Sequence, residues 1–436
     1  MFPSDRTIYN ADNLLVMSRM PDECVDLIYL DPPFNTGKQW ENPLRESGKK
    51  VSFKDTWTLA DIHDDEQDVL ALRHPRAAAV IDALGYANGG SWSAYLTYMG
   101  ARLVQMHRVL KFTGAIYYHC DPTMSHGVKL LMDAIFGKDN CRNEIIWCYS
   151  GGGVPKGAFA RKHDVILAYG KSAKTKFNPQ YRPYSESAGY GRKTIAAKEV
   201  DWERGATMTD WWSDKELMPL GAKISCKERV GYPTEKPIAL LRRILKASSR
   251  PGDLVMDPFC GCGVTAAASE LFFDDRRRWV GIDIGTEASG VLRRKLNKCA
   301  AHLLAGLKVP DVQTLKEADL PPLPPIPQKD ETKKILYKGT GGICPGCTKP
   351  TRMGLMHIDH IIPRAKGGDN DLSNLQLLCG ECNSKKGKRT MNELRRAVAA
   401  ERIAEVVKKD RAKYEKKRAA ELTKAIDKAQ RQGRMV

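Results

Sequence analysis

Long apolar stretches are missing from this chain of 436 residues. No run approaches the ~18 uninterrupted apolar residues that a transmembrane helix needs, so the sequence predicts no membrane span. The first residues, "MFPSDRTIYNADNLL", also lack the charged start and apolar core of a secretory signal peptide. We therefore expect a cytoplasmic protein in a reducing compartment.

Acidic residues are too few to balance the basic ones. The chain has 52 Asp and Glu against 70 Lys and Arg, which gives a formal net charge of +18. Such an excess favours a polyanionic partner, and nucleic acid fits better than an anionic membrane. A surface that is basic only for solubility is the alternative. The length is too great for one ordinary core and suggests two or three domains.

Most of the twelve cysteines follow no pattern and are typical of small buried thiols. The exceptions are two C-x-x-C pairs, a spacing typical of metal ligands, formed by Cys344, Cys347, Cys379 and Cys382. Four thiolates can close a tetrahedral zinc site, which would stabilise a module too small for a large core.

Strand and helix patterns alternate over the first 310 residues. This alternation predicts an α/β fold with a mostly parallel sheet and helices on both faces. Within it, the polar residues 41–90 are expected to be an insertion or a mobile loop. The segments predicted to follow are a proline-rich linker (311–335), a cysteine-containing module (336–392) and a basic helical tail (393–436).

A glycine loop lies between the apolar strand pattern "LVMD" and a helix pattern. Gly261 and Gly263 let the backbone pass close to a ligand at the carboxyl end of a sheet. The next strand ends at Asp283, where a carboxylate can accept both hydroxyls of a ribose. Because there is no third glycine, a nucleoside with a small tail fits better than a dinucleotide. A plain strand–helix turn is the alternative.

The tetrapeptide Asp31-Pro32-Pro33-Phe34 ends the apolar run "VDLIYL". Two prolines are ordinary punctuation after a strand, because proline has no N–H for the sheet. Together with the glycine loop, however, the tetrapeptide resembles the motifs of the amino-type DNA methyltransferases, [DNS]-P-P-[YFW] and F-x-G-x-G. The tetrapeptide precedes the glycine loop, and "YPTEKPIALLRRILKASSRPGD" lies just upstream of that loop. This order of motifs is similar to that of their β class.

This resemblance covers roughly residues 8–305 and implies a Rossmann-like fold that binds S-adenosylmethionine and double-stranded DNA. An exocyclic amine becomes nucleophilic when its N–H groups are accepted, here by Asp31 and the Pro32 carbonyl. Phe34 would stack on a base taken out of the duplex, and Pro33 would stiffen the turn. The implied cofactor residues are Asp12, Asp31, Lys236, Asp257, Phe259, Gly261, Gly263 and Asp283.

The first residue of the motif bears on the target base. An aspartate favours N6 of adenine, whereas Phe34 in place of the commoner tyrosine keeps N4 of cytosine open. Aromatic residues among cations make 172–230 the candidate target-recognition region. An irregular structural insertion is the alternative for that segment.

The residues around the second C-x-x-C pair resemble the HNH endonuclease pattern, D-H-I-x-P, G-G, N-L-Q and L-C-x-x-C-N-x-x-K, over about residues 340–390. The resemblance implies a ββα-metal fold in which His360 activates water and Asn374 orients the loop. Asp359 and Asn383 would bind a divalent ion such as Mg²⁺. A zinc-stapled module that binds DNA without cleaving it is the alternative.

Together these patterns predict a bacterial or phage-encoded restriction–modification protein that methylates and cuts DNA. Two alternatives are an N4-cytosine methyltransferase and a protein in which only the methyltransferase half or only the nuclease half is active. A homodimer is a further expectation.

Overall fold

The computed structural model describes residues 2–43, 50–58, 61–62, 70, 74–150, 155–183, 203–220, 228–270, 276–303, 311–322, 329–366, 374–391, 393–401, 404 and 408. The chain divides into two compact units. The larger comprises Met1–Gln67 and Arg76–Pro324, and the smaller Asp68–Pro75 and Pro325–Val436. Among the described residues, no helix combines the length and apolar character needed to cross a membrane.

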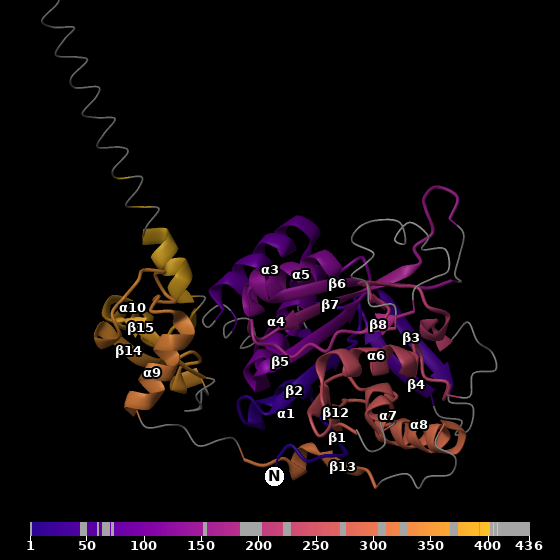
Figure 1. The fold of residues 1–436 in the computed structure, drawn as a ribbon. Coiled ribbons are helices and arrows are strands. Elements are labelled where there is room, and N and C mark those ends of the chain that lie inside the picture. Colours follow the sequence, from indigo (N-terminus) through magenta and orange to yellow (C-terminus); the bar gives the residue numbers. More distant parts are fainter. Residues whose placement is uncertain are drawn as a thin grey trace, which may run out of the picture. The chain divides into compact units, whose positions relative to one another are not determined.

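A nine-stranded sheet forms the centre of the larger unit (Figure 1). Its strand order is β10-β6-β7-β5-β2-β11-β12-β1-β13. Of these strands, β7 runs antiparallel to both neighbours, and the remaining pairs are parallel. The predicted mostly parallel α/β fold is therefore confirmed. The strands are β1 (Thr7–Asn10), β2 (Val25–Leu30), β5 (Leu110–Cys120), β6 (Cys141–Cys148), β7 (His163–Gly170), β10 (Trp211–Trp212), β11 (Leu254–Asp257), β12 (Arg278–Ile282) and β13 (Gln313–Lys316).

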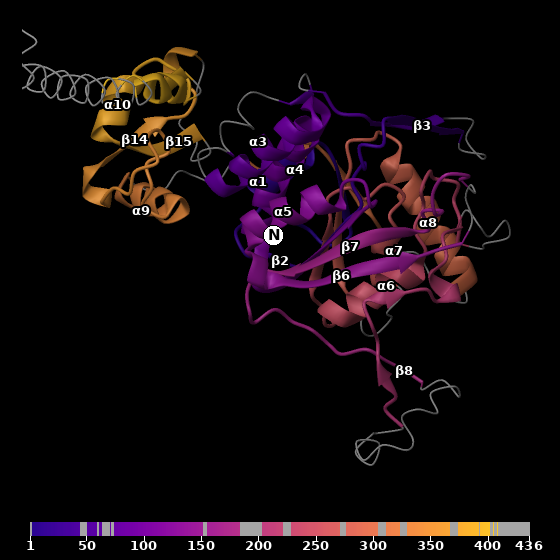
Figure 2. The same cartoon turned by 90° about the horizontal axis from the view of Figure 1, so that it is seen from above.

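Helices cover both faces of this sheet (Figure 2). One face carries α1 (Asn13–Arg19), α3 (Pro75–Asn88), α4 (Gly90–Val109) and α5 (Ser125–Phe136), and the other α6 (Ile238–Ser248), α7 (Val264–Glu270) and α8 (Ala288–Leu303). Leu27 and Tyr29 belong to the core cluster of the second face. Since side chains alternate along a strand, all six residues of β2 are buried between the two layers.

The sheet brings distant parts of the sequence together. β2 pairs with β11, so that Leu27 lies opposite Val255, and β11 continues through β12 to β1. These four strands are parallel, and the carboxyl ends of parallel strands meet at one edge of a sheet. The residues that follow them, Asp31, Pro258, Asp283 and Ala11, therefore emerge at the same edge.

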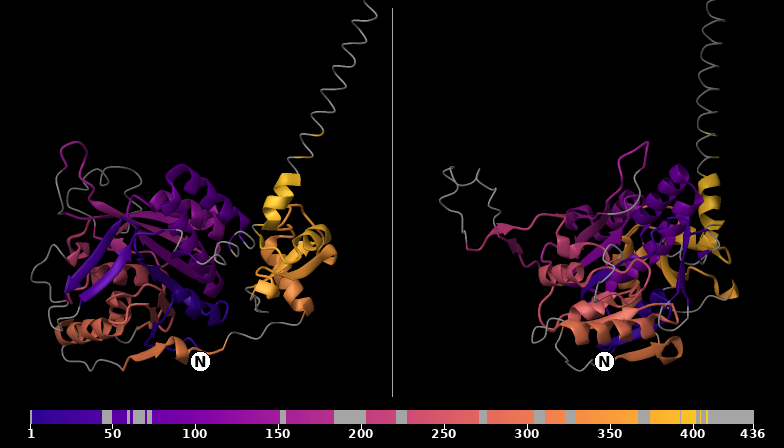
Figure 3. Two further views of the ribbon diagram at one scale, coloured as in Figure 1. Left: turned by 180° about the vertical axis from the view of Figure 1, so that it is seen from behind. Right: turned by 90° about the vertical axis from the view of Figure 1, so that its right-hand side faces the viewer.

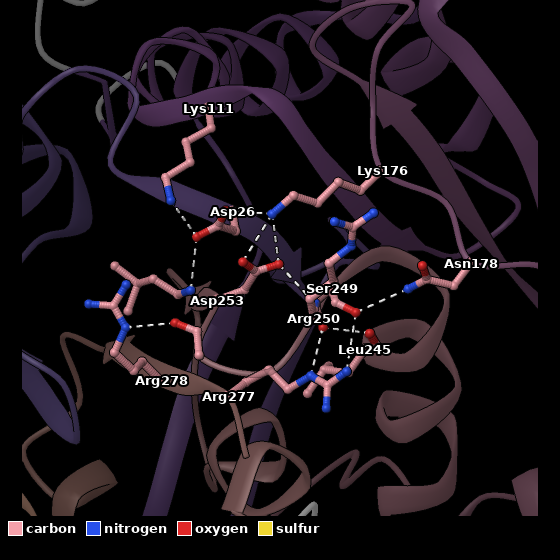
Figure 4. A network of polar contacts seen from close by, with 12 residues as sticks. Asp26, Lys111, Lys176, Asn178, Leu245, Ser249, Arg250, Asp253, Arg277 and Arg278 are labelled. Atoms are coloured by element: carbon pink, nitrogen blue, oxygen red, sulfur yellow. Dashed lines mark hydrogen bonds and ion pairs between the residues drawn. The ribbon is translucent and has the colours of Figure 1, made fainter. Parts of the chain in front are cut away.

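The opposite end of β2 is fixed by a buried carboxylate (Figure 4). Asp26 accepts hydrogen bonds from Lys111 Nζ (2.7 Å), Lys176 Nζ (3.0 Å) and the backbone N of Leu254 (3.0 Å). Lys176 also pairs with Asp253 at 2.9 Å. Because Leu254 begins β11, these bonds hold β2 and β11 side by side away from the ligand edge.

Two segments differ from their sequence patterns or lie partly outside the described residues. Residues 41–90, expected to be an insertion or a mobile loop, contain α3 and part of the hairpin β3 (Lys38–Pro43) and β4 (Lys50–Asp55). Segment 172–230 contributes the edge strand β10, the 3-10 helix η5 (Lys215–Leu217) and a pair of two-residue strands, β8 (Tyr181–Arg182) and β9 (Ala206–Thr207), which projects from the unit (Figure 3). Residues 184–202 and 221–227 lie outside the description.

The predicted linker over 311–335 must be corrected at both ends. Near its start, β13 pairs with β1 as the edge strand of the sheet, and η8 (Glu317–Asp319) follows. Near its end, α9 (Lys329–Thr340) has already begun. Four residues of strand carry too short an alternation to stand out beside a proline-rich stretch. Residues 323–328, which include prolines of that stretch, lie outside the description.

The smaller unit is built on a short antiparallel hairpin. β14 (Met356–His360) pairs with β15 (Leu375–Cys379), so that Asp359 lies opposite Gln376. Its other elements are α9, η9 (Met353–Leu355), η10 (Arg364–Lys366) and α10 (Gly380–Lys386). Its core joins apolar side chains to three of the paired cysteines, with Cys379 packed against them. Of the predicted helical tail, residues 393–401 are helical, and most of the remainder lies outside the description.

Candidate functional site

A cavity of ≈ 560 Å³ opens at the ligand edge of the larger unit. Its walls come from the loops after β1, β2, β11 and β12, together with the segment 232–236 that leads into α6. The predicted residues that line it are Asp12, Asp31, Pro32, Pro33, Phe34, Lys236, Asp257, Phe259, Gly261 and Asp283. Gly263 is not among the lining residues, although it belongs to the same loop.

The glycine loop is shaped by two residues in the left-handed region, Gly261 (φ +47°) and Gly263 (φ +78°). A Cβ at Gly263 would lie 2.4 Å from Leu292 Cγ, so only glycine lets the loop pack on α8. At Gly261 a Cβ would lie 3.1 Å from the ring of Tyr232, which faces the same cavity. The first glycine thus keeps the cavity open, and the second holds the loop in place.

Asp283 forms a hydrogen bond with the backbone of this loop. Its Oδ2 accepts from the N of Gly261 (2.8 Å) and its Oδ1 from the N of Gly285 (2.7 Å). Burial raises the pKa of Asp283, and the two backbone hydrogen bonds oppose that rise. Since a carboxylate oxygen can accept more than one hydrogen bond, both oxygens keep capacity for the hydroxyls of a ribose.

Asp257 connects β11 to α7. Its Oδ2 accepts from the hydroxyl of Thr265 (2.6 Å), and its Oδ1 accepts from the N of Phe259 (3.1 Å). Burial raises the pKa of Asp257 to about 7, and the charges of Asp31 and Asp283 add to the rise. Through its two hydrogen bonds, the Asp257 carboxyl shapes the turn before the glycine loop.

Asp12 caps α1 and is engaged by a buried arginine. Its Oδ1 accepts from the N of Leu14 (2.8 Å), and its Oδ2 accepts from Arg102 (2.8 Å), whose guanidinium lies over the ring of Tyr98. The ring of Trp57 packs against the ring of Tyr98, and their centroids are 4.1 Å apart. Trp57 lines the cavity, and its buried Nε1 has no hydrogen-bond partner among the described residues.

The two oxygens of Asp31 differ in their hydrogen bonding. Its Oδ2 accepts from Lys236 Nζ at 2.5 Å, whereas its buried Oδ1 accepts no hydrogen bond from the described residues. Lys236 Nζ also lies 5.5 Å from the centre of the Phe34 ring. The next loop residues are held by Asp55, which accepts from the N of Asn35 (2.6 Å) and from the hydroxyl of Thr36. Two prolines and these bonds make the loop stiff.

The segment that carries Lys236 is anchored by α8. The ammonium of Lys295 donates to Glu235 Oε1 (2.6 Å) and to the carbonyl of Glu228 (2.9 Å). The side chains of Lys295 and Glu235 are 0% and 2% exposed, so this is a fully buried ion pair. The ion pair fixes Glu235 and, through it, the position of the next residue, Lys236.

Sequence reasoning missed a set of side chains behind Asp31, on β2, β5 and β7: Tyr29, His119 and Asp164. The available signal was a histidine within the apolar strand pattern "GAIYYHC", where an unpaired ring would be costly to bury. It also missed the pocket residues Asp55, Trp57 and Tyr232, for which the sequence offers no spacing signal.

In the smaller unit the four paired cysteines meet. Their sulfur atoms lie within 4.8 Å of one another, and those of Cys347 and Cys379 are 3.8 Å apart. A tetrahedral site with Zn–S bonds of about 2.3 Å places its sulfurs roughly 3.8 Å apart. Backbone N–H groups of Cys379 and Cys382 point at the sulfurs of Cys344 and Cys379. The donor set and its spacing fit a structural zinc ion.

The HNH-type residues lie along the hairpin beside this cluster. Asp359 Oδ2 accepts from Gln376 Nε2 (2.9 Å) and from the buried Lys386 Nζ (2.9 Å), which also donates to the His360 carbonyl (2.6 Å). Lys386 and Gln376 were not predicted. His360 ends β14, and Asn383 follows Cys382 on α10.

Asn374 ties down the segment after His360. Its Oδ1 accepts from the N of Ile362 (2.8 Å), and its Nδ2 donates to the carbonyl of the same residue (3.2 Å). Both ends of the amide therefore hold the chain two residues beyond the histidine.

The larger unit is thus a Rossmann-like α/β structure with a ligand cavity at the carboxyl ends of parallel strands. Residues 25–292 match the DNA methylase family, and the chain belongs to that family. Residues 344–389 match the HNH endonuclease family.

Named relatives match about two thirds of this chain. The chain is 28% identical over 335 residues to the type II methyltransferase M.EcaI of Enterobacter cloacae, covering 63% of this chain and 65% of that protein. It is also 28% identical over 305 residues to the DNA adenine methyltransferase YhdJ of Escherichia coli (strain K12), covering 69% and 85%. The match therefore spans just under two thirds of M.EcaI.

Solved methyltransferases are more distant. The PvuII DNA methyltransferase, described as cytosine-N4-specific, is 13% identical with a TM-score of 0.39, covering 72% of this chain and 97% of that one. The M1.HpyAVI–SAM complex is 14% identical with a TM-score of 0.36, covering 67% and 99%.

Proposed function

We propose that the larger unit transfers a methyl group from S-adenosylmethionine to N6 of an adenine in double-stranded DNA. The observation that supports this is one cavity lined by both the Asp31-Pro32-Pro33-Phe34 loop and the glycine loop, which lie far apart in sequence. Asp31 at the first motif position and the similarity to YhdJ, an adenine methyltransferase by name, favour adenine over cytosine.

The chemistry that we propose starts from a weak nucleophile. The lone pair of an exocyclic amine is conjugated into the base, so the amine must be reshaped before it reacts. The unpartnered Asp31 Oδ1 can accept one N–H and the Pro32 carbonyl the other, which pyramidalises the nitrogen and aims its lone pair. S-adenosylmethionine, when bound, supplies an electrophilic methyl group on a positively charged sulfur. Phe34 supplies the face on which a base taken out of the duplex stacks.

The other cavity residues are proposed to hold the cofactor. Asp283 would accept the ribose hydroxyls, and Asp12 would lie near the adenine. Phe259, Gly261 and Gly263 would surround the methionine and ribose, with Asp257 shaping their turn. The cavity volume and the two loop glycines support this assignment.

For the smaller unit we propose a zinc-stabilised HNH endonuclease. Cys344, Cys347, Cys379 and Cys382 would hold zinc, and Asp359 and Asn383 would bind Mg²⁺. A divalent ion stabilises the charge that develops on phosphate during hydrolysis. His360 would activate the attacking water, and Asn374 would position the loop. Joined to a methyltransferase, such a unit would cut DNA that lacks the methyl mark.

The methyltransferase proposal is tested by the DNA of cells that express the protein. Nucleoside mass spectrometry should detect N6-methyladenine, and methylation-aware sequencing should locate it in one short sequence. The Asp31→Ala variant should remove the mark. In calorimetry it should bind S-adenosylmethionine more weakly but not lose it, because Asp12, Asp283 and the glycine loop remain. N4-methylcytosine instead would contradict the assigned base, and no new methylated base would contradict the proposed reaction.

The nuclease proposal is tested with purified protein, Mg²⁺ and matched methylated and unmethylated DNA. Only unmethylated DNA should be cut, and His360→Ala should abolish cutting without changing methylation. His357→Ala is the matched control, because His357 lies on the same strand and is exposed. Equal cutting of both substrates would contradict the restriction role, and cutting by His360→Ala would contradict the role of His360.

A further inference from the structure

A chain of buried polar side chains lies behind the Asp31 loop. His119, on β5, is 0% exposed, and its two ring nitrogens have different partners. Nδ1 lies 2.9 Å from the Tyr29 hydroxyl on β2, and Nε2 lies 3.1 Å from Asp164 Oδ2 on β7. Asp164 Oδ1 also accepts from the Tyr149 hydroxyl at 3.0 Å. Three strands of the sheet therefore contribute to one hydrogen-bonded chain.

This chain touches the Asp31 loop at two points. The His119 ring lies 5.9 Å from the Phe34 ring, with 33° between their planes. Its Nδ1 also lies 4.0 Å from Asp31 Oδ1, the oxygen that has no hydrogen-bond partner among the described residues. A distance of 4.0 Å is too long for a hydrogen bond. The imidazole thus supports the loop without occupying the free acceptor.

The partners of His119 determine where its proton lies. Burial alone would raise the pKa of Asp164, but the hydrogen bond from His119, the positive charge that this ring carries when protonated, nearby Lys236 and the Tyr149 hydroxyl hold that pKa below its usual value. Asp164 is therefore a carboxylate that only accepts, so Nε2 must be the protonated nitrogen. In the neutral ring Nδ1 is then an acceptor, and the Tyr29 hydroxyl donates to it.

We propose that Tyr29, His119 and Asp164 form a positioning relay that reserves Asp31 Oδ1 for the target amine. With its lone pair on Nδ1, the imidazole has no proton to donate to Asp31. The opposite tautomer would carry a proton on Nδ1, and a ring shift of about 1 Å would bring that proton within hydrogen-bonding distance of the same oxygen. The inference rests on the proposed methyl transfer, because it assigns Oδ1 to the N–H of the substrate.

The tautomer can be measured without any activity assay. In full-length protein with ¹⁵N-labelled histidine, the ring-nitrogen shifts of His119, assigned with the His119→Gln variant, should show the proton on Nε2. A proton on Nδ1, or on both nitrogens, at neutral pH would overturn the relay. This result stands whether or not the protein methylates DNA, so failure of the relay and failure of the proposed function are distinguishable.

The functional arm uses the isosteric Asp164→Asn variant, whose amide can donate to Nε2 and so move the proton to Nδ1. With that tautomer, the single-turnover rate should fall about 100-fold. This is less than the ~10⁴-fold loss that the same exchange causes in serine proteases, because His119 acts through Asp31 and does not itself transfer a proton. The substrates are tritiated S-adenosylmethionine and plasmid from a methylation-deficient strain. The Kd for S-adenosylmethionine should stay within about threefold, since only the transferring geometry changes.

Whichever tautomer His119 adopts in the Asp164→Asn variant, the measured rate tests the relay. If the proton moves to Nδ1 and the rate stays at the wild-type value, the relay is wrong. If the proton stays on Nε2, the relay requires a rate near wild type, and a large fall would equally overturn it. Asp133→Asn is the matched control, because Asp133 accepts from the Tyr169 hydroxyl (2.7 Å) and does not line the cavity. Its rate should be unchanged.

Discussion

In the larger unit, Asp31 follows a strand whose six residues are all buried, whereas in the smaller unit Asp359 lies on a strand with one buried residue, Met356. Asp31 is approached by Lys236 from the segment before α6 and by His119 from β5. Asp359 is held by Gln376 and Lys386, close in space to four cysteines. The same kind of side chain is thus positioned by a wide sheet in one unit and by a small hairpin in the other.

The difference follows from the amount of core that each unit can build. A sheet with helices on both faces buries enough apolar surface to carry several buried polar groups. A two-stranded hairpin with a few short helices does not, and small domains of this kind depend on metal or disulfide cross-links. We therefore expect the two units to respond oppositely to metal removal and to loss of buried polar contacts.

Metal removal should have the largest effect. Structural zinc contributes about 10–16 kcal/mol of apparent binding free energy in zinc-finger peptides, and that energy is folding energy. Chelation, or Cys382→Ser, should therefore unfold the smaller unit and abolish hydrogen-exchange protection over 344–389. All eight tryptophans precede residue 280, so tryptophan fluorescence reports the larger unit alone and should not change. Hydrogen-exchange protection that survives chelation would contradict the expectation that the smaller unit depends on metal.

The parts of the molecule that were predictable have local sequence signals. A strand that stops at two prolines, a glycine pair before a helix and two C-x-x-C pairs each fix their own surroundings within a few residues. Parallel pairing then places Asp31 and the glycine loop at one edge of the sheet, which explains why the resemblance led to the right fold.

The parts that were missed depend on contacts between strands that no spacing encodes. His119 meets Tyr29 and Asp164 only because β5 lies between β2 and β7. Lys386 reaches Asp359 only because α10 folds back on the hairpin. The helix α3 was missed for another reason, since its alanine-rich sequence has few buried residues and no clear apolar stripe.

The buried ion pair of the larger unit should give the next largest effect. Lys295→Met leaves Glu235 buried without its charged partner, which costs about 3–5 kcal/mol of unfolding free energy. Lys298→Met, on the same helix, removes a bond from a half-buried lysine to the Arg229 carbonyl and should cost about 1 kcal/mol. Urea unfolding followed by tryptophan fluorescence measures both. Equal costs would show that burial of the pair does not matter to this unit.

Asp257 should make the stability of the larger unit depend on pH. Burial raises its pKa to about 7 from an ordinary value of 3.8, so between these values the folded state binds the proton more tightly than the unfolded state. Its contribution to stability is therefore present at low pH and is lost as pH rises toward 7. Relative to Asp257→Asn, the wild type should lose about 2–3 kcal/mol between pH 5 and pH 8. A difference that is constant with pH would contradict a buried, protonated Asp257.

The smallest effects should come from the lysines around Asp26. Lys176 is 20% exposed in its side chain and bridges Asp26 and Asp253, whereas Lys111 is 37% exposed and, within the described part of the chain, forms an ion pair with Asp26 only. Lys176→Met should cost about 2 kcal/mol, because a buried carboxylate and a half-buried one both lose a charged donor. Lys111→Met should cost about 0.5 kcal/mol, since water can replace an exposed ammonium. If both cost the same in urea unfolding, Asp26 would depend on nearby positive charge in general rather than on buried hydrogen bonds. The larger unit would then resemble the smaller one more closely. Its buried Asp26 would depend on nearby cations rather than on packing, as the smaller unit is expected to depend on zinc.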